Sequence, residues 1–234
     1  MNYQINKKLI MRLFLLVLII SVCITTGFAQ TNGKFIDKDT AYTSVINARA
    51  KKIVATIGIT DSLKANHVKN IIANQYRNLN DIQTLRDTQI KAIKVSGGDK
   101  DAVNEQVKKI ENEADSKITA LHCKFLSALS KELTPKQVDQ VKDGLTYNVV
   151  HVTFNGYTQM IPELTDKQKE QIMAWLVEAR EHAMDAGSSE KKHAWFGKYK
   201  GRINNYLSAQ GYDLKKEGQE WEKRRNEAKV TSAK

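Results

Sequence analysis

Apolar residues recur at intervals of three and four over most of the chain beyond residue 40. This period places them on one face of an α-helix, so it predicts helices rather than strands. A first helix is expected to end at Gly58, and a second, capped by Thr60 or Asp61, extends to the Gly97-Gly98 pair. A third long stripe follows, so we expect two long helices to form an antiparallel hairpin that turns at these glycines.

Shorter helices are predicted in the second half, where turn residues interrupt the apolar pattern more often. Their expected ranges are 134–144, 165–187, 188–211 and 213–228. The exception is the segment 147–157, whose sequence YNVVHVTFNGY is rich in β-branched and aromatic residues. This composition favours a strand, either as one extended segment or as a hairpin that turns at an Asn-Gly pair.

These patterns predict a mostly α fold, in which a long helical hairpin is followed by a smaller helical bundle with one short extended or β segment. We expect residues 30–228 to form a single helical domain with two halves. The long-helix half covers 30–144, the aromatic-rich half covers 145–228, and 229–234 form a frayed tail. The oligomeric state stays open at this point.

The first 29 residues have the three parts of a secretory signal peptide. Lys7, Lys8 and Arg12 precede an apolar run over 13–24, and small residues occupy positions −3 and −1 before the expected cleavage site after Ala29. The run is short of the roughly 20 residues that span a bilayer, so we expect cleavage rather than an uncleaved anchor. A lipoprotein attached through Cys23 is disfavoured, because Val22 stands where a small residue is expected. The mature protein is therefore predicted to be periplasmic or secreted, without a stable membrane span.

Export changes how charge and cysteine content are interpreted. The formal net charge of the whole chain is +11, and cleavage would remove three cations and leave +8. We expect no nucleic-acid partner, since an exported protein meets little nucleic acid, whereas an anionic glycan suits a basic surface. The one remaining cysteine, Cys123, cannot form an intramolecular disulfide, and we expect it to be a half-buried core residue.

Two copies of an LTxxQ pattern occur, at 133–137 and 164–168. In each, the threonine is expected to accept a hydrogen bond from the third helical amide while the glutamine reaches back to the threonine amide, which is a capping box. The paired motifs in a small exported helical protein also resemble those of the Spy-type periplasmic chaperones. That resemblance implies a function in holding unfolded client proteins.

Several longer blocks are similar to an exported family of unknown function from polysaccharide-degrading Gram-negative bacteria, whose members are labelled sugar-binding. The blocks lie at 50–54, 71–80, 152–157, 160–162, 183–189 and 196–206. Together they extend the resemblance over roughly residues 38–221. The resemblance implies carbohydrate binding or an accessory role in polysaccharide use, and it implies no catalytic mechanism.

Ten aromatic residues follow position 145, and they supply the candidate ligand-binding residues. Sugar sites place aromatic rings against the apolar face of the sugar and address its hydroxyls with amides and charged groups. The candidates are Tyr157, Trp195 and Tyr199, with Lys198, Arg202 and Asn155. The alternative is that the aromatics, which recur at helical spacing, belong to the core. Gly197 and Gly201 share a helix face, and we expect them to permit close packing of another helix.

Signals for enzymatic chemistry are weak. None of the five histidines has the spacing of a metal site, and no glycine-rich phosphate loop is present. We therefore expect no metal, no cofactor and no catalytic residue. The leading hypothesis is a non-enzymatic carbohydrate-binding protein, the alternative is a chaperone or stress adaptor, and an enzyme would require a cleft with converging carboxylates.

Overall fold

The computed structural model describes residues 38–232, and within this range it contains eight α-helices and no strand. The mostly α fold is thus confirmed. The predicted signal peptide lies outside the described residues. In the part of the chain that is described, no helix is long and apolar enough to cross a membrane.

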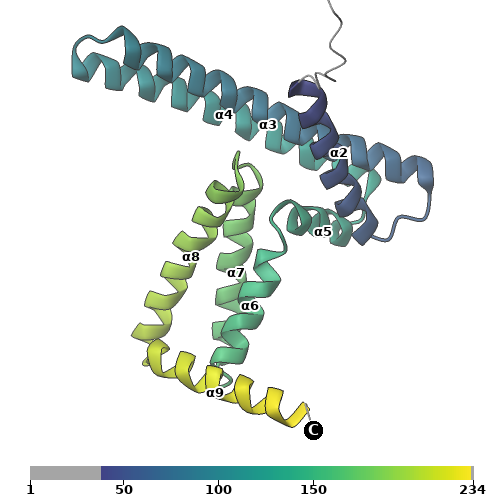
Figure 1. The fold of residues 1–234 in the computed structure, drawn as a ribbon, viewed down its shortest axis with the longest axis vertical. Coiled ribbons are helices and arrows are strands. Elements are labelled where there is room, and N and C mark those ends of the chain that lie inside the picture. Colours follow the sequence, from purple (N-terminus) through teal and green to yellow (C-terminus); the bar gives the residue numbers. More distant parts are fainter. Residues whose placement is uncertain (1–37, 233–234) are drawn as a thin grey trace, which may run out of the picture. The chain divides into compact units, whose positions relative to one another are not determined.

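The first core is built around a long helical hairpin, as predicted (Figure 1). Helices α3 (Ser62–Ser96) and α4 (Lys100–Glu132) pack along each other. The turn uses Gly97 and Gly98 with φ of 69° and 123°, a conformation that favours glycine. Helices α2 (Lys38–Thr56) and α5 (Pro135–Leu145) pack against each other, α2 on α3 and α5 on α4.

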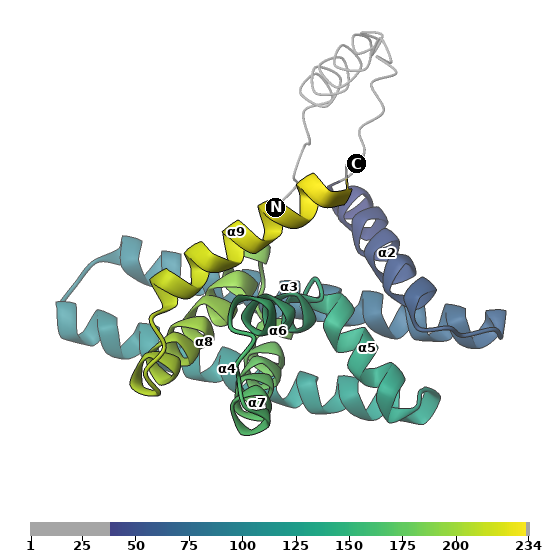
Figure 2. The same ribbon diagram turned by 90° about the horizontal axis from the view of Figure 1, so that it is seen from below.

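The second core joins the remaining helices (Figure 2). These are α6 (Val149–Met160), α7 (Asp166–Met184), α8 (Ser189–Ala209) and α9 (Leu214–Ser232). Helix α7 packs between α6 and α8, and α9 contacts both α6 and α8. Phe196, Ile203 and Leu207 of α8 are completely or almost completely buried, which is the reason for their helical spacing.

The predicted strand over 147–157 is wrong, because residues 149–160 form helix α6. Val150 and Tyr157, two helical turns apart, are both buried against the second core. Packing of this apolar face outweighs the local preference of valines for extended backbone. The Asn155-Gly156 pair lies inside the helix, and the turn falls instead at Tyr147 and Asn148, which have φ of 59° and 58°.

Both LTxxQ motifs form the expected capping boxes, on α5 and on α7. Each leucine is buried, Leu133 in the first core and Leu164 in the second. Each glutamine also reaches a distant segment. Gln137 Nε2 donates to the carbonyl of Ile57, and Gln168 Oε1 accepts from the Tyr212 hydroxyl, at 3.0 Å in both cases. In each core, the motif thus caps the start of a helix and links it by a hydrogen bond to a distant segment.

Two local predictions are wrong. Cys123 is exposed, because it lies on the face of α4 opposite the buried Phe125 and Leu129. Gly197 and Gly201 do not face another helix, and a Cβ added at either would meet nothing within 4 Å. Both glycines are exposed on α8.

Alanine substitutions at two glycines should change the free energy of unfolding in opposite directions. A Cβ at Gly144 in α5 would lie 2.9 Å from Ile53 Cγ1 of α2, closer than real side chains approach. Gly144→Ala should therefore lower the free energy of unfolding by about 1–3 kcal/mol, since the two helices are pushed apart. Gly201→Ala, in open space, should raise it by about 0.5–1 kcal/mol, because alanine favours the helix. Urea denaturation of both variants tests this, and stabilisation by Gly144→Ala would contradict the packing.

Candidate functional site

A groove of about 830 Å³ lies between the hairpin and the end of α7 with the start of α8. It is lined by fifteen residues from three parts of the chain. These are Gln83, Arg86, Asp115, Ile118, Thr119 and His122 of the hairpin, Glu181, His182, Asp185, Ala186 and Gly187 at the end of α7, and Lys191, Ala194, Trp195 and Lys198 of α8. The two walls come from helices that belong to different cores.

The connection after α7 holds the walls together. Gln83 Nε2 of α3 donates a hydrogen bond of 3.2 Å to the backbone carbonyl of Asp185. Gly187 permits this approach, because a Cβ there would overlap the Gln83 side-chain amide. Met184, the last residue of α7, is 1% exposed and inserts into the first core. The end of α7 is thereby fixed against the hairpin.

His122 and Asp185 form a hydrogen bond between α4 and the end of α7. His122 Nδ1 of α4 lies 2.7 Å from Asp185 Oδ2, and the two side chains are 23% and 15% exposed. The hydrogen bond to Asp185 raises the pKa of His122 above its usual 6.5, against the opposing effect of burial. Asp185 Oδ1 is buried without a hydrogen-bond partner among the described residues.

A buried lysine completes the end of α7. Lys192 Nζ donates to the carbonyls of Ala183 and Met184, at 3.1 Å and 2.9 Å, and so places a cation at the C-terminal end of the helix. Burial lowers the pKa of this amine to about 8, although the charge of Asp185 acts in the opposite direction. Lys192 is therefore a structural cation behind the groove rather than part of its lining.

Aromatic surface lines the groove on the side of α7 and α8. The rings of His182 and Trp195 stack with centroids 4.4 Å apart and an angle of 15° between their planes. Lys198 Nζ lies 5.1 Å from the centroid of Trp195. Neither Lys191 nor Lys198 has an ion-pair partner within residues 39–229, so both ammonium groups are available to an anion.

The acidic residues of the groove differ in whether they already have a charged partner within the protein. Asp185 is paired with His122, as described, and Glu181 Oε2 accepts from Lys142 Nζ at 2.9 Å. Asp115 has no ion pair in the described part of the chain. The free charges of the lining are thus two lysines and one carboxylate, beside an Arg86 that pairs with the exposed Asp87 at 2.7 Å.

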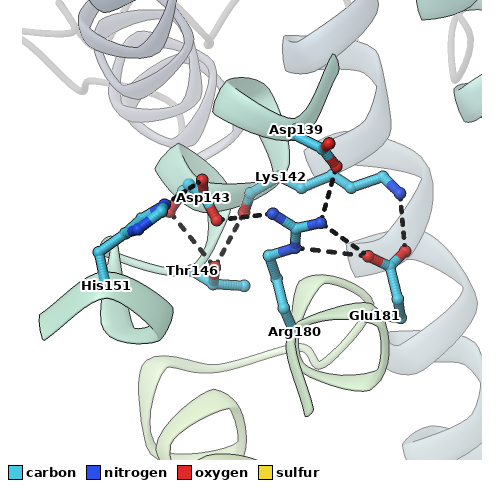
Figure 3. A network of polar contacts seen from close by, with 7 residues as sticks. All are labelled: Asp139, Lys142, Asp143, Thr146, His151, Arg180 and Glu181. Atoms are coloured by element: carbon cyan, nitrogen blue, oxygen red, sulfur yellow. Dashed lines mark hydrogen bonds and ion pairs between the residues drawn. The ribbon is translucent and has the colours of Figure 1, made fainter. Parts of the chain in front are cut away.

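A network behind Glu181 connects α5, α6 and α7 (Figure 3). Arg180, which is 5% exposed, contacts Asp143 at 2.8 Å, Asp139 at 2.7 Å and Glu181 at 3.3 Å. Burial opposes its charge, but the hydrogen bond to Asp143 and the nearby carboxylates raise the pKa of Arg180 further. His151 of α6 adds a contact of 3.0 Å to Asp143. The network holds the groove carboxylate Glu181 in place.

The six predicted ligand-binding residues occupy different places. Trp195 and Lys198 line the groove. Tyr199 and Tyr157 are buried at 6% and 7%, and the Tyr157 hydroxyl donates to Asn204 Oδ1 at 2.6 Å. Arg202 stacks on Trp175 outside the groove, with 4.6 Å to the ring centroid, and Asn155 is exposed on α6.

Tyr157 lines a second, smaller cavity of about 400 Å³. Its other lining residues come from α6, α8 and α9, and they include Met160, Leu214 and Trp221. The structure therefore separates Tyr157 from Trp195, although both are aromatic residues of the same core.

Sequence reasoning missed the hairpin side of the groove. His122 and Asp185 are 63 positions apart, and Gln83 and Asp185 are 102 apart, so no local pattern connects them. Neither spacing nor composition pointed to His182 as the stacking partner of Trp195. Among the described residues, no cluster of three or more histidine, cysteine or acidic side chains could hold a metal ion.

A family model described as "Protein of unknown function (DUF3826)" matches residues 43–227. The chain belongs to this family. The match covers every residue that lines the groove of this DUF3826 protein. A comparison with curated proteins finds no match.

Proposed function

We propose that this DUF3826 protein binds an acidic carbohydrate in the groove between the hairpin and the α7–α8 end. The observation that supports this most is the stacked pair of Trp195 and His182 in a groove that also holds two unpaired lysines. Trp195 is half-buried and His182 is exposed, so aromatic surface faces the groove. An apolar sugar face can pack on such a surface, with few polar groups fixing its orientation.

The charges favour an acidic sugar over a neutral one. Lys191 and Lys198 can bind a carboxylate or sulfate group, and the flexible stem of Lys198 allows its ammonium to move off the indole ring. Asp115 can accept hydrogen bonds from sugar hydroxyls. This arrangement agrees with an exported protein that encounters acidic polysaccharides outside the cytoplasm.

Titration calorimetry with matched oligosaccharides tests the proposal. Oligogalacturonate should bind, and a neutral galactose oligomer of the same length should bind more weakly. Trp195→Ala should weaken oligogalacturonate binding about tenfold or more, which corresponds to about 1.4 kcal/mol. Lys191→Met with Lys198→Met should remove the preference for the acidic oligomer but leave binding of the neutral one.

The control is Trp221→Ala, which removes a half-buried tryptophan that lines the other cavity and leaves the groove intact. Its affinity should equal that of the wild type. Equal losses in Trp221→Ala and Trp195→Ala would place the ligand elsewhere, and an absence of binding to acidic and neutral oligomers alike would contradict the proposal.

The chaperone hypothesis stays a prediction. Its motif residues Thr134, Gln137, Thr165 and Gln168 are all engaged in helix capping. Apolar side chains are exposed on α3, at Leu63, Leu85 and Val95, and these supply the surface on which a client could bind. They are spread along the helix, whereas the groove brings its aromatic and charged groups to one place.

A further inference from the structure

We propose that the groove also performs proton transfer, with His122 as the base and Asp185 as the residue that positions it, on a 4-linked uronate bound beside Lys191 and Lys198. This inference rests on the proposed function, because it requires an acidic sugar in the groove. The reaction class is β-elimination, which cleaves the chain without water.

The geometry around His122 has the form of a positioned base. Nδ1 is held 2.7 Å from Asp185 Oδ2, which leaves Nε2 as the ring nitrogen without a partner among the described residues. Asp185 is itself held, since its backbone carbonyl accepts from Gln83 and its side chain is largely buried. A carboxylate that accepts a hydrogen bond from one imidazole nitrogen fixes the tautomer and makes the other nitrogen more basic. His122 lines the groove, so that nitrogen can reach a bound ligand.

The elimination also requires a cation that neutralises the uronate carboxylate, and the two lysines near Trp195 can supply it. The hydrogen at C5 of a uronate lies next to the carboxylate, and it becomes more acidic when the carboxylate charge is neutralised. Lys191 and Lys198 have no ion-pair partner in the described chain and can provide that neutralisation. The stacked Trp195 and His182 then hold the sugar ring in the same groove.

The bonds and protons of the reaction balance. His122 Nε2 takes the C5 proton, and the electrons of the C5–H bond form a C4=C5 double bond. The bond between C4 and the glycosidic oxygen breaks, this oxygen takes a proton from the solvent, and the imidazolium releases its proton to the solvent. The products are a shortened chain and a chain with an unsaturated uronate at its end, and His122 returns to its neutral form.

The charges that face His122 come from α5, from α7 and from the connection after α7. Asp185 and Glu181 favour its protonated form, whereas Lys142 and burial oppose it. The net effect is a pKa above 6.5, which brings the base close to neutral pH, where general bases are most effective. The elimination rate should therefore rise with pH through this raised pKa and then level off.

The experiment uses the mature chain with two probes, α-4-linked oligogalacturonate and β-4-linked oligomannuronate. Ultraviolet absorbance of the conjugated double bond and mass spectrometry report the unsaturated product. His122→Gln should lower the elimination rate about 100-fold or more, while calorimetry shows that oligosaccharide binding persists. His193→Gln is the matched control, because His193 stacks on Tyr147 outside the groove lining and should leave the rate unchanged.

Each other outcome overturns the inference. Binding of either uronate without an unsaturated product would leave His122 and Asp185 as a structural pair, and the proposed function would stand. A saturated product that has gained water would identify hydrolysis instead. No binding at all would remove both proposals. If His122→Gln loses its helical circular dichroism, Asp185→Asn serves in its place, and it should slow elimination and shift the pH profile to lower pH.

Discussion

Replacing Arg180 with methionine should lower the free energy of unfolding by about 3–5 kcal/mol. Arg180 is 5% exposed, and its guanidinium lies 2.8 Å from Asp143 and 2.7 Å from Asp139. Methionine keeps much of the volume but leaves the largely buried Asp143 without its main cation. A buried charge that loses its partner is costly, whereas the intact pair contributes much less. Urea denaturation monitored by circular dichroism measures the difference.

Arg202→Met is the matched control for this experiment. Arg202 is 54% exposed and lies 3.5 Å from Glu178, so its ion pair is screened by water. Loss of this ion pair and of the contact with the Trp175 ring should lower the free energy of unfolding by at most about 1–2 kcal/mol, less than the loss expected at Arg180. Combining Arg180→Met with Asp143→Leu should recover part of the loss, because the unpaired carboxylate is gone. Equal effects of Arg180→Met and Arg202→Met would show that burial of the network contributes nothing.

Replacing Met184 with alanine should lower the free energy of unfolding by about 2–5 kcal/mol, because it leaves a cavity in the first core. Met184 is 1% exposed, and it belongs to a helix whose other buried apolar residues lie in the second core. It therefore ties the groove wall formed by the end of α7 to the wall formed by the hairpin. We expect ligand affinity to fall together with stability, measured by calorimetry and urea denaturation.

Met173→Ala is the control, because it removes packing within one core and does not affect the contact between α7 and the first core. Met173 is half-buried on the same helix and packs only against the second core. Its removal should lower the free energy of unfolding by about 1 kcal/mol or less and leave ligand affinity unchanged. If Met184→Ala destabilised no more than Met173→Ala, the insertion of α7 into the first core would not contribute to stability.

Local signals in the sequence predicted how several helices begin. Thr134 and Thr165 cap their helices with Gln137 and Gln168, and Asp61, one of the two predicted candidates, caps α3. Each of these hydrogen bonds joins residues two or three positions apart, so neighbours in the sequence suffice to predict it. The hairpin was predictable for the same reason, since two long apolar stripes meet at a pair of glycines with positive φ.

The candidate site was predicted only in part. Trp195 and Lys198 were among the predicted ligand-binding residues, and both line the groove. Tyr157 and Tyr199 belong to the same aromatic pattern, yet their rings are buried in the second core. Composition and spacing do not distinguish a buried ring from one at a groove, because that depends on which helix packs over it.

The sequence by itself determined a mostly α-helical chain, the hairpin turn and the caps of α5 and α7, because these depend on residues within one or two turns of each other. Tertiary structure decided that residues 149–160 are helical, since the burial of Val150 and Tyr157 outweighs their local preference. It also created the groove, where Gln83, His122 and Asp185 meet from positions far apart in the chain. Such contacts follow from how the end of α7 packs into the first core through Met184, and no local pattern encodes that arrangement.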